Sequence, residues 1–544
     1  MSIASRIFAK TFKLPPAETY DIEVERNIQI PMADGAILLA DHYSPRRKRK
    51  LPTVLIRSPY GRSGIYGLYF GRLFAERGFQ VLIQSCRGTF GSEKEFMPFQ
   101  DEKADGLATL EWLKSQPWFS GEIATVGQSY LGYVQWAIAA EAGSMLKAMA
   151  PQITASEFHS LTYPGGSFGL DTVLNWAYIL AHQEDPLLTT IQNRAQAAKK
   201  MRLAYLHLPL CGADTVAIGK PGAFFCHCIE HGASDDEWWD QVDFSPTVPE
   251  ITAPVHLMGG WYDIFLPEMI ADYTRLKEAG RQPYLTVGPW THVSPELFVQ
   301  SLRESIIWFR SAIYGDRSSL RNSPVRVFVM GASQWKDFSE WPPAGSTPQR
   351  WYLQPGGKLS TTRPVESEPD RYRYDPADPT PAVGGSALSR NSGPKDNRAL
   401  EARPDVLTFT TATLDKDLEV IGPVEAELFV DSSLEHTDFF VRLCDVFPSG
   451  KSLNVCDGLL RISPGRPARG PDGCFQIKVQ LWPTAYLFRS GHRVRVQVSS
   501  GAHPRFVRNP GSGEPLGAAI NLLPADQAVY HQPGMPSAII LPVQ

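Results

Sequence analysis

The sequence predicts an α/β core with an inserted helical region, followed by a C-terminal all-β domain. Short apolar runs alternate with helical patterns up to residue 320, and residues 153–249 lose the strand signal. Proline is concentrated after residue 320, since 25 of the 45 prolines lie in residues 321–544. Because proline breaks helices and punctuates turns, this last part should have a different architecture from the rest.

Residues 20–152 are expected to form the first part of the α/β core. Apolar runs at Thr53–Ile56, Gln80–Ile83 and Ile123–Val126 are typical of strands buried on both faces of a mainly parallel sheet. In Asp101–Ser115, apolar residues recur every three positions after acidic residues at the start, which predicts a helix. Strands that alternate with helices indicate a doubly wound α/β fold.

Residues 153–249 are expected to form a helical cap inserted into this core, which then resumes over residues 250–320. The cap contains two helical patterns without proline, Thr172–His182 and Leu187–Leu206. The resumed core is predicted to contain two strands and two helices: Val255–Met258, Leu266–Ala279, Tyr284–Val287 and Pro295–Tyr314. This order repeats the alternation of the first part.

Residues 321–544 are expected to form a β-sandwich or jelly roll. Strands are predicted at Val325–Met330, Val424–Asp431 and His492–Ser499, separated by turns rich in proline and glycine. In the last strand, alternation places three valines toward a core and three polar side chains toward solvent: Val494, Val496 and Val498 against Arg493, Arg495 and Gln497. Residues 364–403 are expected to form a long loop.

Composition excludes several classes of protein. The 53 basic and 57 acidic residues give a net charge of −4, whereas a nucleic-acid-binding protein would show a basic surplus. No run of 18 apolar residues exists, and the N-terminus is too polar for a secretory signal, so we expect neither a membrane span nor export. The seven cysteines are an odd number, which predicts reduced thiols and a cytoplasmic location.

The strongest local motif is Ile-Ala-Thr-Val-Gly-Gln-Ser-Tyr-Leu-Gly over residues 123–132. A buried strand runs into a sharp turn and then a helix, and Gly127 and Gly132 leave room where the two nearly touch. This geometry exposes the Ser129 hydroxyl at the carboxyl end of the sheet, where a nucleophile is useful. The strict Gly-x-Ser-x-Gly pattern is not met, because Leu131 occupies its fifth position. The alternative is a tight connection without catalytic function.

An acid and a base follow Ser129 in the order that α/β-hydrolases use. Asp263 comes just past the strand that ends in Gly-Gly-Trp-Tyr-Asp, and His292 follows the strand that ends in Gly-Pro-Trp-Thr-His. Singly, Asp263 could be a turn residue and His292 a loop histidine. The ordered set of three, each after a strand, predicts a catalytic triad.

Acyl transfer also needs donors for the developing oxyanion. The backbone N–H of Tyr130 directly follows the nucleophile, and the loop after the Thr53–Ile56 strand places Tyr60 where its hydroxyl could be a second donor. The alternative for Tyr60 is an aromatic anchor packed under its loop.

Together these segments resemble the cocaine esterase-like hydrolases of the X-Pro dipeptidyl-peptidase family, which also holds glutaryl-cephalosporin acylases and α-amino acid ester hydrolases. The resemblance covers nearly the whole chain, at Met32–Gly35, Arg57–Tyr60, Arg87–Gly88, Gly127–Gly132, Gly259–Asp263, Gly288–His292, Val325–Gly331 and Trp341–Pro343. It implies an α/β-hydrolase with a helical cap and a C-terminal jelly roll.

For individual residues, the resemblance implies that Ser129 is the nucleophile, Asp263 the acid and His292 the base. It implies that the Tyr60 hydroxyl and the Tyr130 N–H form the oxyanion hole. Aromatic residues of the acyl pocket would be Tyr163, Trp176 and Phe265.

The chain departs from the family pattern at two places in one loop. Ser85 stands where the family often has aspartate, and Lys94 where it often has glycine, which puts the local loop geometry in doubt. Only about 20 residues precede the core, whereas dipeptidyl-peptidase members carry an added N-terminal domain. The apolar residues Ile264, Phe265 and Leu266 after the acid point to an uncharged acyl group.

We therefore expect a serine hydrolase that cleaves a small-molecule ester without a cofactor. Cleavage of an amide or an X-Pro peptide is the alternative, and a carbohydrate-binding protein with an inactive hydrolase domain is a third. We also consider a homodimer. We expect no metal site, since the cluster Cys226, His227, Cys228 and His231 has no second cluster to pair with. The basic run Arg46–Lys50 is expected to be a solvated turn.

Overall fold

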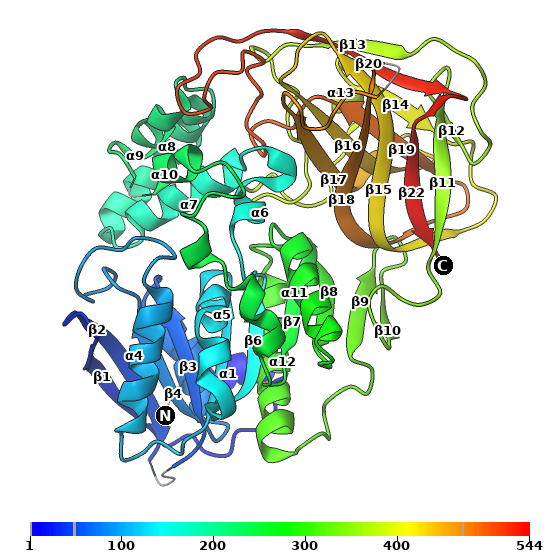
Figure 1. The fold of residues 1–544 in the computed structure, drawn as a ribbon. Coiled ribbons are helices and arrows are strands. Elements are labelled where there is room, and N and C mark those ends of the chain that lie inside the picture. Colours follow the sequence, from blue (N-terminus) through cyan, green and yellow to red (C-terminus); the bar gives the residue numbers. More distant parts are fainter. Residues whose placement is uncertain (1–2, 47–49, 223, 471–472) are drawn as a thin grey trace. The chain divides into compact units, whose positions relative to one another are not determined.

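The computed structural model describes residues 3–46, 50–222, 224–470 and 473–544, so most of the Arg46–Lys50 run lies outside the described residues. The chain divides into two compact units (Figure 1). Each unit has its own cluster of buried hydrophobic residues. The first comprises Met1–Phe158, Asp235–Gly260 and Phe265–Arg326. The second comprises His159–Ser234, Trp261–Ile264 and Val327–Gln544.

A sheet with parallel central strands forms the core of the first unit, which confirms the predicted α/β class. Its strand order is β1-β2-β4-β3-β5-β6-β7-β8. β3 pairs in parallel with β4 and β5, and β5, β6 and β7 continue in parallel, whereas β2 is antiparallel to β1 and β4. The strands are β1 (Ile22–Pro31), β2 (Ile37–Pro45), β3 (Thr53–Ser58), β4 (Gln80–Ser85), β5 (Ile123–Gln128), β6 (Leu146–Gln152), β7 (His256–Tyr262) and β8 (Tyr284–Thr291).

The predicted helices of this unit are confirmed within one residue at each end. α4 lies beside α5 (Figure 1), and α12 packs on β6, where Trp308 Nε1 donates a hydrogen bond of 3.0 Å to the Met149 carbonyl. Every residue of β3, β4 and β5 is buried, as expected of strands covered on both faces. The helices are α1 (Ile3–Thr11), α2 (Gly64–Tyr66), α3 (Leu73–Ala75), α4 (Glu102–Lys114), α5 (Tyr130–Ala142), α11 (Leu266–Glu278) and α12 (Pro295–Tyr314).

Residues 159–234 of the second unit are helical, and their described part contains no strand. Apolar residues on one side of α7 are buried, including Val173, Leu174 and Ala177. The two longest helices match the two predicted patterns. The helices are α6 (His159–Thr162), α7 (Leu170–His182), α8 (Leu187–Tyr205), α9 (Ala213–Ile218) and α10 (Phe225–Glu230).

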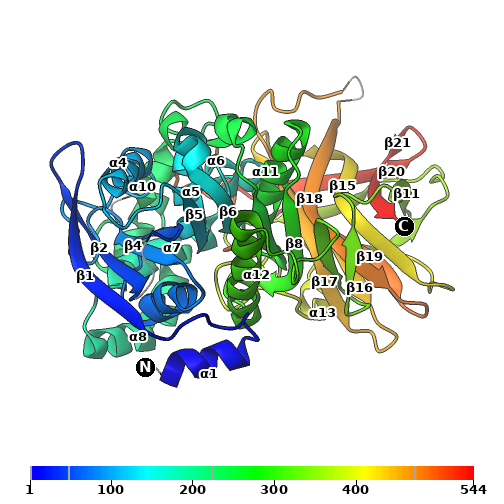
Figure 2. The same ribbon diagram turned by 90° about the horizontal axis from the view of Figure 1, so that it is seen from below.

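The rest of the second unit is a largely antiparallel β domain, as predicted. Its longest pair joins β15 to β18 in antiparallel register (Figure 2), and buried residues alternate with partly exposed ones along β15. Two strands, β9 (Val325–Val329) and β10 (Gln334–Phe338), precede it. The others are β11 (Thr347–Gln354), β12 (Lys358–Ser360), β13 (Asp370–Tyr374), β14 (Leu407–Thr410), β15 (Leu418–Ser432), β16 (Thr437–Val446), β17 (Ser452–Ile462), β18 (Phe475–Phe488), β19 (Arg493–Ser499), β20 (Ala525–Gln532), β21 (Met535–Pro536) and β22 (Ala538–Val543).

Two local predictions in this domain are wrong. The expected loop over residues 364–403 contains β13 and the short helix α13 (Arg398–Glu401), because Tyr372 and Tyr374 alternate into the core between arginines. The alternation along residues 492–499 predicts that Gln497 faces solvent, but its side chain is buried. Its amide donates a hydrogen bond of 2.9 Å to Glu401 Oε1, which compensates for burial of a polar group.

The expectation of free thiols is wrong for one pair. Cys211 and Cys226 form a disulfide that joins the segment before α9 to α10. The other five cysteines, all within the described part of the chain, are buried and form no disulfide. Among the described residues, we find no helix with the length and hydrophobicity needed to cross a bilayer.

Candidate active site

Ser129 lies in the sharp turn between β5 and α5, as the sequence predicts. Its backbone has φ 56° and ψ −122°, a strained conformation that L-residues seldom adopt. Both glycines of the motif are needed for space. A Cβ on Gly127 would lie 2.3 Å from Leu131 Cβ, and one on Gly132 would lie 2.3 Å from Thr154 Cγ2. The turn therefore presents the Ser129 hydroxyl beyond the carboxyl end of β5.

His292 is within hydrogen-bonding distance of this hydroxyl. It follows the last residue of β8, and its Nε2 lies 3.1 Å from Ser129 Oγ. The imidazole is mostly buried, whereas Ser129 is partly exposed. The ring of Phe265 packs 5.5 Å from that of His292. A serine and a histidine in this arrangement form a nucleophile and its general base.

Asp263 immediately follows β7 and is 1 % exposed. Its backbone carbonyl accepts a hydrogen bond of 3.2 Å from Trp482 Nε1 in the second unit, to which Asp263 belongs. Its role as the triad acid stays a prediction.

The two expected oxyanion donors follow neighbouring strands. β3 and β5 pair in parallel with Thr53 opposite Ile123, a register that places the end of β3 level with the end of β5. Tyr60 comes two residues after β3, is half-buried, and donates its backbone N–H to Ser58 Oγ at 3.1 Å. Tyr130 is the first residue of α5 and is buried.

Beneath Ser129 lies a polar layer that the sequence motifs do not predict. The backbone N–H of Ser129 donates to the Gln152 carbonyl at 2.9 Å. The amides of Gln128 and Gln152 donate to Ser301 and Ser305 of α12 at 2.5 and 2.7 Å. The signal in the sequence is the i, i+4 spacing of two serines within an otherwise apolar helix face. These bonds attach to α12 the end of β5, which leads into Ser129, and the neighbouring end of β6.

The three predicted pocket residues lie in different surroundings. Phe265 packs between His292 and Phe158, with ring centroids 5.5 Å from each. In the second unit, Tyr163 is buried and donates its hydroxyl to the Cys228 carbonyl at 2.7 Å. Trp176 packs against Phe224 at 4.8 Å. The assignment of Tyr163 and Trp176 to an acyl pocket stays a prediction.

The two departures from the family pattern differ in their effect on the backbone. Lys94 has φ 68°, a left-handed conformation that glycine adopts without strain but that a residue with a Cβ disfavours. Ser85 accepts a hydrogen bond of 2.9 Å on its hydroxyl from Arg62, which also pairs with Asp41 at 3.3 Å.

The Cys/His cluster does not present four free ligands. Cys226 is bonded to Cys211, and a disulfide sulfur is not a thiolate ligand. His227 Nδ1 pairs with Glu230 at 3.6 Å on the same helix.

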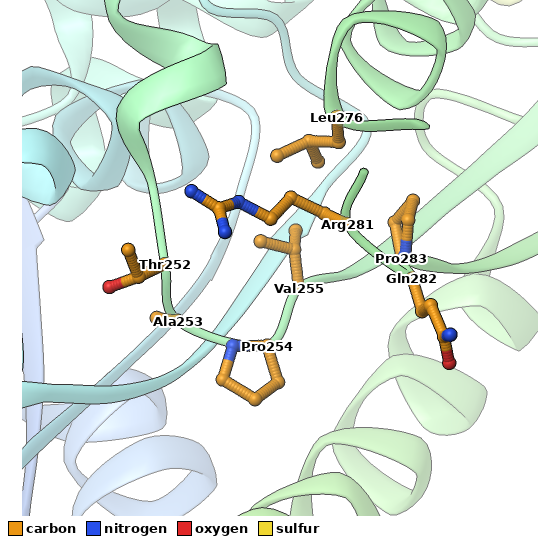
Figure 3. A pocket seen from close by; sticks show the side chains of 8 residues that line it. All are labelled: Thr252, Ala253, Pro254, Val255, Leu276, Arg281, Gln282 and Pro283. Carbon is orange, nitrogen blue, oxygen red and sulfur yellow. The ribbon is translucent and has the colours of Figure 1, made fainter. Parts of the chain in front are cut away.

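A cavity of about 170 Å³ lies at the amino end of β7, away from the strand ends that carry Ser129. Figure 3 shows the Arg281 side chain running between Leu276 and Val255 toward the segment that begins at Thr252. Because active sites of parallel sheets lie at the carboxyl ends of the strands, this cavity is separate from the candidate site.

Comparison with known proteins finds family models and relatives that cover most of the chain. A model of the X-Pro dipeptidyl-peptidase (S15 family) matches residues 34–294, and one of the X-Pro dipeptidyl-peptidase C-terminal non-catalytic domain matches residues 320–540. The chain is 30% identical to cocaine esterase of Rhodococcus sp., over 96% of this chain and 98% of that protein. It is 25% identical to a putative serine esterase of Mycobacterium bovis, over 89% and 91% of the two chains.

Several solved structures share the fold. An alpha-amino acid ester hydrolase superposes with a TM-score of 0.80 at 23% identity and covers 98% of both chains. An aminopeptidase from a marine sediment archaeon of the Thaumarchaeota superposes with the same TM-score and identity over 97% of both chains.

Proposed function

The chain belongs to the X-Pro dipeptidyl-peptidase S15 family and is a serine ester hydrolase, and we propose that it cleaves esters of small, uncharged carboxylic acids by means of Ser129, His292 and Asp263. The observation that carries this proposal is the 3.1 Å hydrogen bond between Ser129 Oγ and His292 Nε2 on a strained strand-to-helix turn. Strain at such a turn is a feature of catalytic nucleophiles.

The proposed reaction is acyl transfer in two steps. His292 takes the proton of Ser129, whose oxygen attacks the ester carbonyl to form a tetrahedral intermediate. The Tyr60 hydroxyl and the Tyr130 N–H donate hydrogen bonds to the oxyanion. His292 then protonates the leaving alcohol, and afterwards activates the water that releases the acid. The proposed role of Asp263 is to hold the imidazole tautomer and stabilise its cation.

The apolar surroundings of His292 support an uncharged acyl group. The ring of Phe265 lies against His292 and against Phe158, which in turn packs on Phe99 with centroids 4.2 Å apart. A charged acyl group would have to be desolvated against these rings, which is unfavourable without a partner.

Substitution of the nucleophile tests the proposal. We expect Ser129→Ala to lower the kcat for p-nitrophenyl esters by roughly 10⁴–10⁶-fold and to abolish labelling by a fluorophosphonate probe. Ser115→Ala, at an exposed serine just past α4, is the control and should leave both unchanged. Wild-type turnover by Ser129→Ala would show that the assignment is wrong.

A peptidase or amidase is the second candidate, because the family model and the resemblance to a putative Xaa-Pro dipeptidyl-peptidase of Bacillus anthracis both favour it. Rates on aryl esters compared with X-Pro anilides separate the two. An inactive carbohydrate-binding protein would fail to react with the fluorophosphonate. The cytoplasmic location and the homodimer stay predictions, which cell fractionation and light scattering test.

A further inference from the structure

A buried carboxylate, Glu102, lies in the first turn of α4. The sequence pattern of Asp101–Ser115 has acidic residues at its start, where the helix dipole favours exposed carboxylates. Instead Glu102 is 4 % exposed. An ionised side chain in such a place is costly unless each of its oxygens is paired.

Both oxygens of this carboxylate are paired, one with Tyr130 of the proposed oxyanion hole and the other with Arg57. Oε1 accepts a hydrogen bond of 2.8 Å from the hydroxyl of Tyr130. Oε2 forms an ion pair with Arg57 Nη2 at 2.7 Å, and the side chains of this pair are 5 % and 1 % exposed. The Glu102 backbone carbonyl accepts a further bond of 2.6 Å from Arg57 Nη1.

The two partners of Glu102 lead to the two oxyanion donors. Tyr130 carries one donor on its own backbone N–H, at the first position of α5. Arg57 is the second-last residue of β3, three positions before Tyr60, and the turn between them is closed by the bond from Tyr60 N to Ser58 Oγ. One carboxylate is therefore bonded to both segments that supply donors.

The Tyr130 side chain is held in place by two hydrogen bonds and a ring contact. Its hydroxyl donates to Glu102 and accepts a bond of 2.9 Å from the Phe99 backbone N–H, while its ring stacks on that of Phe99 at 5.4 Å. Burial, and then the charge of Glu102, raise the pKa of the Tyr130 phenol well above its usual range, so the hydroxyl remains a donor.

We propose that Glu102 is a positioning residue that aligns the Tyr60 hydroxyl and the Tyr130 N–H on the oxyanion. The inference rests on the proposed function. A donor in an oxyanion hole is effective only when it is held in place before charge develops, and loss of one donor lowers kcat by roughly 10²–10³-fold. Glu102 restricts the movement of both donors through Arg57 and the Tyr130 ring.

The test uses Tyr130→Phe, which removes the phenol–carboxylate bond but keeps the ring and the backbone donor. We expect kcat for a p-nitrophenyl ester to fall by about tenfold or more with KM within about twofold. Phenylboronic acid, whose adduct with Ser129 carries the tetrahedral oxygen, should bind more weakly by the same factor as kcat/KM.

Tyr133→Phe is the matched control. Tyr133 is equally buried in the same helix, but its hydroxyl donates to the Val242 carbonyl at 3.1 Å, and the Phe99 carbonyl lies 3.4 Å away. It should leave the boronate affinity unchanged. Glu102→Gln is the second variant, since it keeps an acceptor for Tyr130 but removes the charge opposite Arg57, and it should lower kcat in the same way.

Unchanged kcat and boronate affinity in Tyr130→Phe, with a melting temperature lowered as in Tyr133→Phe, would overturn the proposal by showing a purely structural role. This outcome differs from failure of the proposed function, which an active Ser129→Ala enzyme would reveal. If Glu102→Gln does not fold, Tyr130→Phe decides alone, because it leaves the Arg57–Glu102 pair intact.

Discussion

At the scale of single residues, the site depends on two glycines, which have no Cβ atom. Gly127 and Gly132 leave the space in which Leu131 and Thr154 pack against the turn of Ser129. This part of the site was predictable from sequence, because glycines that flank a serine between a strand and a helix are typical of a nucleophile on a tight turn.

Gly132→Ala should move this turn. Its Cβ would lie 2.3 Å from Thr154 Cγ2, so we expect a loss of stability of about 1–3 kcal/mol and a kcat/KM lowered by about tenfold or more through displacement of Ser129. Urea unfolding and ester hydrolysis measure the two effects. Gly534→Ala is the control, because Gly534 is exposed and a Cβ there would meet nothing within 4 Å. Equal behaviour of the two variants would contradict the steric argument.

Asp272 should give the stability of the first unit an unusual dependence on pH. Burial raises its pKa from 3.8 to about 6, although Ser156 donates to it at 2.9 Å and Arg275 pairs with it at 2.9 Å. Because the folded state holds this proton more tightly than the unfolded state, the contribution is full below about pH 4 and is lost as pH rises through 6.

The variant Asp272→Asn isolates this contribution. Relative to the variant, the wild-type protein should lose up to about 3 kcal/mol between pH 4 and pH 6.5, with no further change above pH 7. Urea unfolding of both proteins across this range measures the difference. Parallel stability curves would mean that the carboxyl is already ionised throughout.

At the scale of elements, the hydrophobic periodicity of the sequence predicts where a helix begins and ends, but not which distant residues its side chains contact. α12 has the bounds that its apolar pattern predicts, because such a pattern depends only on neighbours along the chain. The inward direction of Glu102 depends on Arg57, 45 residues away, and no local pattern contains that pairing. β13 was missed because prolines on both sides concealed its short alternation.

The disulfide Cys211–Cys226 should stabilise the helical part of the second unit. It closes a loop of 15 residues that ends in α10, and closing a loop of this length stabilises the folded state by about 3 kcal/mol. In the same helix, the Cys228 carbonyl accepts a hydrogen bond from the Tyr163 hydroxyl. We expect Cys211→Ser to speed proteolysis between α9 and α10, and dithiothreitol to do the same to the wild-type protein but not to the variant. Seven reactive thiols in the unfolded, unreduced protein would contradict the bond.

At the scale of the whole molecule, positive and negative charges nearly cancel, but some ion pairs are buried and others are exposed. The second unit buries Asp457 between Arg442 and Arg505, and the side chains of Asp457 and Arg442 are 3 % and 0 % exposed. The surface carries pairs such as Arg373–Asp526, which are more than half exposed. Net charge, the quantity that the sequence provides, does not distinguish the two kinds of pair. Their energetic difference has to be measured within the intact chain.

Asp457→Asn should therefore destabilise one unit only. It leaves two buried guanidinium groups without their shared charge, which costs about 3–5 kcal/mol, whereas Asp526→Asn at the exposed pair should cost less than about 1 kcal/mol. Because each unit has its own hydrophobic cluster, we expect calorimetry to resolve two transitions and Asp457→Asn to lower only one. A single transition that shifts as a whole would show that the two units unfold together, and the stability of the Ser129 site would then depend on a carboxylate in the other unit.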